Sequence, residues 1–195
     1  VRKAGNLNTP YALLVKKKAF ESYKLKLDKY YARDLFREEA IEIIINELNP
    51  DDIVVSTTGV ASRELFEYRT KKSQSHEKDF LTVGGMGHAS QIALGISLFK
   101  KNRTVFCIDG DGALIMHMGA LAVNANNAGD NFKHIVINNC AHDSVGGQPT
   151  VGDKIDIRGI ATSAGYRWSK KVSTIEEIIK AIQEMIKRGP IQQPY

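Results

Sequence analysis

Residues 104–139 read TVFCIDGDGALIMHMGALAVNANNAGDNFKHIVINN, and the order of residue types in this stretch decides the fold class. In order, the stretch predicts a strand, a Gly-Asp-Gly turn, a helix and a second strand, at 104–108, 110–112, 113–128 and 134–137. The second strand ends at Asn138 and Asn139. Parallel strands need a crossover connection of this length between them, so the stretch is typical of a βαβ unit.

The sequence on both sides continues the alternation of helices and strands. Helices are predicted at 33–48, 61–68, 88–99, 156–164 and 173–188, and strands at 52–56, 80–83 and 166–172. The last helix begins with a capping box formed by Ser173 and Glu176, and its isoleucines share one face. Because the strands are short and continuously apolar, we expect an α/β fold, with a mostly parallel sheet and helices on both faces.

The composition excludes several classes of protein. The 195 residues are 43% hydrophobic and 25% charged, which is typical of a folded domain and not of a disordered tail. No apolar run approaches the roughly 18 residues of a membrane span. Two cysteines cannot build a disulfide framework, which favours a reducing, cytoplasmic setting. The net charge of +5 is spread over scattered lysines, so a basic nucleic-acid-binding module is kept only as the non-enzyme alternative.

The two ends of the sequence carry segments that lack partners. Residues 10–15 predict a buried strand with no neighbour close in sequence, and the residues after 188 would lead into a final strand. We therefore expect a fragment of a longer polypeptide. Its predicted parts are a remnant of a preceding domain, a linker and a main domain with a truncated last strand, at 1–18, 19–32 and 33–195.

The residues best suited to binding a ligand follow the middle strands. Glycine-rich or asparagine-rich segments end three predicted strands, at 84–88, 110–112 and 138–139. Ligands of parallel α/β sheets bind beyond the carboxyl ends of the strands. Gly110 and Gly112 let the backbone approach a ligand closely, and the amides that follow suit a diphosphate. The Asp111 carboxylate and the Asn139 amide offer the oxygen ligands that Mg²⁺ prefers. Taken alone, Asp111 also suits a helix N-cap and the asparagine pair a turn.

The spacing of these motifs resembles a known signature. Gly-Asp-Gly, 25 intervening residues and Asn-Asn resemble the thiamine-diphosphate signature. The segments at 56–65, 79–90 and 142–150 are similar to the C-terminal, diphosphate-binding half of thiamine-diphosphate-dependent decarboxylases of the phosphonopyruvate decarboxylase family. Residues 9–17 resemble the last strand of the pyrimidine-binding domain that precedes this half in the family.

The resemblance implies a set of site residues. It implies Mg²⁺ held by the side chains of Asp111 and Asn139 and by the backbone carbonyl of Ala141. Met86 is expected to press the cofactor into a bent shape, and His142 is expected to act on the substrate head group. The thiamine diphosphate contacts that the resemblance implies come from Ser56, Thr57, Gly59, Gly85, Met86, His88, Gly110, Asp111, Gly112, Ala113, Asn139, Ser144 and Val145.

The resemblance also implies an activity. It indicates a carbon–carbon lyase of phosphonate biosynthesis, which decarboxylates 3-phosphonopyruvate to phosphonoacetaldehyde and CO₂ in an oligomer. The activating glutamate of the family lies on the pyrimidine-binding domain of the same or a neighbouring chain, so this chain alone is expected to be inactive. A sulfopyruvate decarboxylase β-type subunit is the first alternative. A 2-oxoacid:ferredoxin oxidoreductase β-type subunit is the second, although no cysteines have the spacing of a cluster site.

Overall fold

The computed structural model describes residues 12, 14–17, 19–21 and 35–188. The chain divides into two compact units, Val1–Ala32 and Arg33–Tyr195, and almost all of the described residues belong to the second. Half of the predicted strand at 10–15 is described, and there the prediction of a buried strand was wrong: Ala12, Leu14 and Val15 are exposed and belong to no strand. Most of the predicted linker and the whole predicted strand after residue 188 fall outside the described residues.

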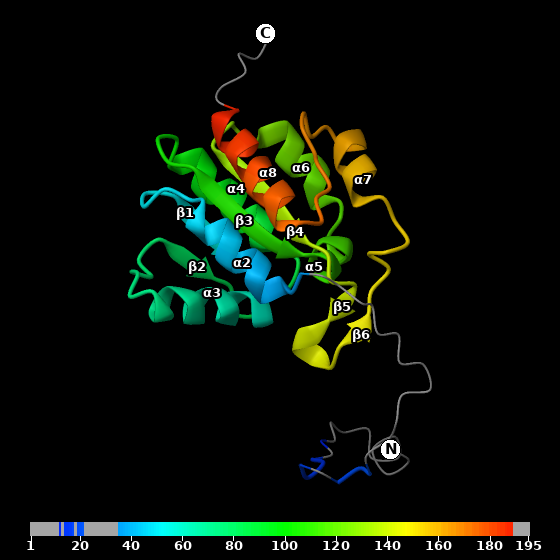
Figure 1. The fold of residues 1–195 in the computed structure, drawn as a ribbon. Coiled ribbons are helices and arrows are strands. Elements are labelled where there is room, and N and C mark those ends of the chain that lie inside the picture. The colour runs from blue at the N-terminus through cyan, green and yellow to red at the C-terminus, as the bar shows by residue number, and fades with distance from the viewer. Residues whose placement is uncertain (1–11, 13, 18, 22–34, 189–195) are drawn as a thin grey trace. The chain divides into compact units, whose positions relative to one another are not determined.

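A parallel sheet of four strands forms the centre of the second unit (Figure 1). The strands are β1 (Ile53–Ser56), β2 (Asp79–Leu81), β3 (Val105–Gly110) and β4 (Phe132–Ile137). Their order in the sheet is β2-β1-β3-β4, and Cys107 in β3 pairs with Val55 on one side and His134 on the other. All three pairings are parallel, so the carboxyl ends of the strands share one edge, as the sequence predicted.

Helices cover both faces of the sheet. They are α2 (Arg37–Asn46), α3 (Val60–Lys71), α4 (Ala89–Phe99), α5 (Asp111–Met116), α6 (Ala120–Asn127), α7 (Ile157–Ser163) and α8 (Ile175–Lys187). Side chains alternate across a strand, so Val54 packs in a core with α2, α3 and α8, while Val55 packs in a second core with α4. This arrangement confirms the predicted α/β class.

The helix predicted at 113–128 is two helices, α5 and α6. The break contains Gly119, a poor helix former. The break also places the His117 ring against Gly87, where an added Cβ would lie 2.4 Å from His117 Cδ2. The first helix ends at Met116, directly before His117, and no pattern in the sequence marks this tertiary contact.

Two further predictions were wrong in detail. No strand forms at 166–172: the Tyr166 N–H donates to the Ala161 carbonyl at 3.0 Å at the end of α7, and the Tyr166 hydroxyl lies 2.9 Å from His134 Nδ1. The capping box lies one residue later than predicted, at Thr174 and Glu177, where the Glu177 N–H donates to Thr174 Oγ1 at 3.3 Å. Ser173 and Thr174 are both competent caps, so composition alone cannot choose between them.

The long loop predicted after β4 contains a small antiparallel hairpin. Its parts are β5 (Ala141–His142), the 3₁₀ helix η1 (Asp143–Val145) and β6 (Gln148–Pro149). The hairpin carries several of the predicted site residues. Among the described residues, no helix is both long enough and apolar enough to span a membrane.

Candidate functional site

A pocket lies where β1, β3 and β4 end. Ten predicted site residues line it: Thr57, Met86, Gly110, Asp111, Gly112, Ala113, Asn139, Ala141, His142 and Ser144. They come from the ends of the strands, from α5, from the loop after β2 and from the hairpin. The topology therefore brings most of the predicted set together from segments that are far apart in sequence.

The other five predicted residues do not line the pocket. Ser56 is fully buried, and its carbonyl accepts a hydrogen bond from the Thr82 hydroxyl at 2.8 Å. Gly59 directly precedes α3 and lies against Ser144. Gly85 lies in the exposed loop after β2. His88 packs edge-on against His117, and Val145 is 66% exposed.

The Gly-Asp-Gly turn joins β3 to α5. Gly110 is the last residue of β3, and Asp111 begins the helix with its side chain buried. The Thr150 hydroxyl donates a hydrogen bond to Asp111 Oδ2. Gly152 faces the same oxygen closely, because an added Cβ there would lie 2.6 Å from Asp111 Oδ2. The turn therefore presents a buried carboxylate at the floor of the pocket.

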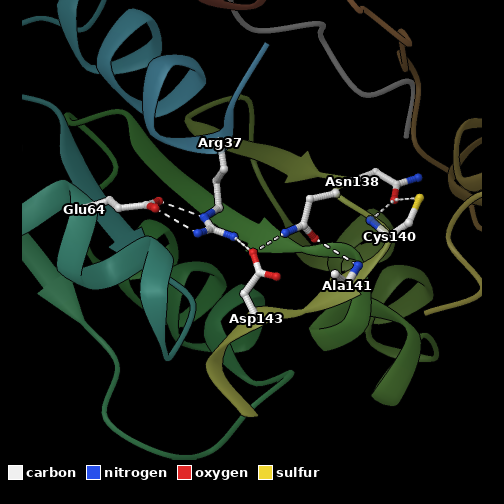
Figure 2. Close-up of polar contacts among 7 residues, drawn as sticks. Arg37, Glu64, Asn138, Cys140, Ala141 and Asp143 are labelled. Carbon is white, nitrogen blue, oxygen red and sulfur yellow. Dashed lines mark hydrogen bonds and ion pairs between the residues drawn. The ribbon is translucent and has the colours of Figure 1, made fainter. Parts of the chain in front are cut away.

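The two neighbouring asparagines are used differently (Figure 2). The Asn138 Nδ2 donates to the Gly152 carbonyl at 2.7 Å, and its Oδ1 accepts from the Cys140 N–H at 3.2 Å. Asn138 therefore fixes the backbone of the loop. Asn139 lines the pocket, and its Oδ1 accepts from the Ala141 N–H at 3.2 Å. Only the second asparagine of the pair offers its amide to the pocket.

The hairpin brings His142 close to the turn. An added Cβ on Gly112 would lie 2.3 Å from His142 Cε1, so the imidazole packs directly on the Gly112 backbone. Only glycine leaves room for that approach. This contact places an imidazole beside the segment that the sequence assigned to a diphosphate.

Sequence reasoning missed several residues of the pocket. They are Arg37, Thr58, Val60, Ala61, Asp109, Ile137 and Asp143. Arg37 comes from α2, and its guanidinium pairs with Glu64 in α3 and with Asp143 in η1. These hydrogen bonds, with Glu64 the stronger partner, raise the pKa of Arg37 above its ordinary value. No local pattern in the sequence marks an arginine whose partners lie 27 and 106 residues away.

A buried polar cluster supports the turn from below. Asp109 Oδ1 accepts from the Gly110 N–H at 2.9 Å, and Asp109 Oδ2 lies 3.5 Å from His134 Nε2. Cys107 lies beside them, and burial raises the pKa of its thiol well above the ordinary value. Burial also raises the pKa of Tyr166, which contacts His134 from the other side, to about 12. These groups therefore stay in their neutral thiol and phenol forms near neutral pH.

The pocket fits a divalent cation that carries a diphosphate. Asp111 is 1% exposed, and the ion pairs found among the described residues do not include it. A buried carboxylate without a cationic partner is costly unless a cation binds beside it. The amide oxygen of Asn139 and the backbone carbonyl of Ala141 are further hard oxygen donors on the same pocket.

The fold and the pocket together define the class of protein: a parallel α/β domain whose strand edge is suited to a metal–diphosphate group. Residues 57–192 match the family model described as "Thiamine pyrophosphate enzyme, C-terminal TPP binding domain". The chain belongs to this family. Thiamine pyrophosphate is another name for thiamine diphosphate, so the cofactor predicted from the sequence is confirmed.

Two kinds of curated relative are similar to the chain. The "Phosphonopyruvate decarboxylase" of Streptomyces hygroscopicus is 36% identical over 146 residues, which are 75% of this chain and 35% of that protein. The "Sulfopyruvate decarboxylase subunit beta" of Methanococcus maripaludis is 36% identical over 132 residues, which are 68% of each chain. The chain thus spans about a third of the length of the phosphonopyruvate decarboxylase that it matches.

Solved structures support the fold. The thiamine diphosphate-dependent 4-hydroxybenzoylformate decarboxylase of Rhodococcus jostii RHA1 superposes with a TM-score of 0.65 at 18% identity. The match covers 86% of this chain and 33% of that one. The benzoylformate decarboxylase of Polynucleobacter necessarius gives a TM-score of 0.63 at 18% identity, over 80% of this chain and 31% of that one. At these identities the likeness concerns the fold alone.

Proposed function

We propose that this chain is the diphosphate-binding half of a thiamine-diphosphate- and Mg²⁺-dependent decarboxylase that converts 3-phosphonopyruvate to phosphonoacetaldehyde and CO₂. The observation that carries the proposal is the convergence of Asp111, Asn139 and Ala141 on one pocket at the strand edge. The similarity to phosphonopyruvate decarboxylases supports the choice of reaction.

Each part of the pocket has a role in this proposal. Asp111, the Asn139 amide and the Ala141 carbonyl would hold Mg²⁺, and the backbone amides of Gly112 and Ala113 would hold the diphosphate. When bound, thiamine diphosphate supplies a nucleophilic carbon and an electron sink for the loss of CO₂. Met86 enters the pocket from the loop after β2 and would press the cofactor into its bent shape.

The hairpin is the proposed substrate-binding element. His142 and Ser144 line the pocket from β5 and η1, and both can donate hydrogen bonds to an anionic head group. A phosphonate and a sulfonate are similar in size and geometry, so these donors suit either. Sulfopyruvate is therefore the second candidate substrate. The chain is as similar to a sulfopyruvate decarboxylase β subunit as to a phosphonopyruvate decarboxylase, at 36% identity, and it covers 68% of the former against 35% of the latter. These values support sulfopyruvate as the second candidate.

The cofactor also needs an acid that activates its pyrimidine ring. The three carboxylates of the pocket already have partners: Asp109 with Gly110, Asp111 with Thr150, and Asp143 with Arg37. We place the activating glutamate on a pyrimidine-binding domain, supplied by the same or a neighbouring chain in a cytoplasmic homo-oligomer. The chain alone is therefore proposed to be inactive.

The substrate is tested by measuring CO₂ release from 3-phosphonopyruvate and from sulfopyruvate, using the enzyme that contains this chain and its pyrimidine-binding domain. We expect a kcat/KM at least about tenfold higher for phosphonopyruvate, which corresponds to about 1.4 kcal/mol of transition-state discrimination. This chain without the other domain should release no CO₂ above background.

The opposite preference would assign the protein to sulfopyruvate. Turnover of neither acid, in an enzyme that binds thiamine diphosphate, would refute the proposed reaction while leaving the cofactor site intact. Turnover by the chain alone would refute the placement of the activating acid.

A further inference from the structure

Four side chains form a continuous polar chain from the helices to the proposed metal ligand (Figure 2). Glu64 accepts two hydrogen bonds from Arg37, from Nε at 2.7 Å and from Nη2 at 2.8 Å. The Arg37 Nη1 donates to Asp143 Oδ2. The same Asp143 oxygen accepts from Asn139 Nδ2 at 2.7 Å. The chain therefore ends on an amide that lines the pocket.

The contact with Asp143 decides which way the Asn139 amide faces. An amide has a donor end and an acceptor end of nearly the same shape, so packing alone does not distinguish them. If the Asn139 amide were rotated by half a turn, its oxygen would face the Asp143 carboxylate and its NH₂ would lose that acceptor. The rotated NH₂ would also meet the Ala141 N–H, which now donates to Oδ1. Both contacts would be repulsive, so the observed orientation is strongly favoured.

Arg37 in turn fixes Asp143. The guanidinium is planar and grips Glu64 with two parallel bonds, which orients it rigidly. The Arg37 and Glu64 side chains are only 17% and 14% exposed, and they belong to α2 and α3. Asp143 is 38% exposed and lies on the 3₁₀ turn of the hairpin. The packed helices therefore hold the more exposed carboxylate in place.

We propose that Asp143, held by Arg37, is a positioning residue that keeps the oxygen of Asn139, and not its NH₂, available to the metal ion. The inference rests on the proposed function, in which Asn139 is a metal ligand. In this inference Asp143 and Arg37 affect the affinity for the metal ion by orienting Asn139, and they do not contact the reacting atoms. Partners outside the ligand shell typically change metal affinity by about 10–100-fold.

The test is a Mn²⁺ titration of the full-length protein with thiamine diphosphate present, followed by the electron paramagnetic resonance signal of free Mn²⁺. We expect Asp143→Ala to weaken Mn²⁺ binding by about 10–100-fold. Asp143→Asn should restore affinity to within about threefold, because its amide oxygen can accept both hydrogen bonds. Asp51→Ala is the matched control: Asp51 forms an exposed ion pair with Lys78 at 2.7 Å, away from the pocket.

An Asn139→Asp background separates orientation from mere structural support. A carboxylate presents oxygen in both rotamers, so there is no amide to orient. In this background Asp143→Asn is the reference, because it removes the repulsion between the two carboxylates just as Asp143→Ala does. We therefore expect Asp143→Ala to bind Mn²⁺ within about threefold of Asp143→Asn in the Asn139→Asp protein, which gives a large coupling in the double-mutant cycle. Circular dichroism and thermal unfolding of each variant confirm that the compared proteins are folded.

Three other outcomes are informative. Equal losses from Asp143→Ala in both backgrounds would overturn the positioning role and make the network merely structural. No loss in either background would overturn it as well. If the unmodified protein does not bind Mn²⁺ with thiamine diphosphate, the proposed metal site itself fails, which is a different result from the failure of the positioning role.

Discussion

Asp111→Asn is expected to weaken Mg²⁺-dependent binding of thiamine diphosphate by more than about 100-fold. Changes to residues outside the ligand shell of a metal cost up to about 100-fold, and Asp111 is proposed as a ligand itself, so its loss should cost more. The substitution removes the one buried negative charge that we assign to the metal, while it keeps the size of the side chain. The asparagine oxygen can still accept the hydrogen bond from Thr150. The loss should therefore appear in binding and not in the fold.

The measurement is a calorimetric titration of thiamine diphosphate at fixed Mg²⁺, with thermal unfolding recorded for the same samples. Asp51→Asn, which removes an exposed carboxylate far from the pocket, should bind like the unmodified protein. Affinity of the Asp111→Asn protein within about threefold of the unmodified protein would remove Asp111 from the metal site.

Phe106→Ala is expected to lower the free energy of unfolding by about 3–5 kcal/mol, the range for a buried aromatic side chain that leaves a cavity. Phe106 lies in β3, is fully buried and is the largest of the completely buried side chains among the described residues. Its strand leads directly into the turn at Asp111, so its packing also supports the site.

Phe99→Ala is the matched control for this prediction, because the same side chain at the end of α4 is 88% exposed. We expect it to change the free energy of unfolding by less than about 0.5 kcal/mol. Urea denaturation without ligand measures both variants. Equal effects of the two substitutions would contradict the assignment of Phe106 to the core.

The sequence predicted the framework of the fold because the relevant signals are local. The apolar run that ends at Ile108 and the one that ends before Asn138 each lie in a strand, buried in β3 and mostly half-buried in β4, and their parallel pairing follows from the helical connection. The same logic placed Asp111 and Asn139 on one edge of the sheet. Strand ends, glycine turns and crossover lengths can all be recognised from residue type and spacing.

The parts that sequence could not predict depend on tertiary contacts. Arg37 reaches the pocket only because α2 packs beside α3, which brings Glu64 and Asp143 to its two sides. His117 follows the end of α5 and contacts Gly87, and the Tyr166 hydroxyl contacts His134 where a strand was expected. Each case involves partners that are far apart in the chain and have no spacing rule.

The match to the thiamine pyrophosphate enzyme family covers residues 57–192, so it concerns the whole domain and not single motifs. It agrees with the cofactor that the Gly-Asp-Gly and Asn-Asn motifs indicated. Relatives with either substrate in their names are equally similar to the chain, at 36% identity. The assay on both acids decides the head group of the substrate.

The most direct test of the central claim is a titration of the full-length protein with thiamine diphosphate, once with Mg²⁺ and once with the chelator EDTA. The account predicts saturable binding of one thiamine diphosphate per chain with Mg²⁺. It also predicts at least about 100-fold weaker binding with EDTA, because Asp111 and the diphosphate would then lack the cation between them. Absence of binding with Mg²⁺, or equal binding with and without EDTA, would contradict it.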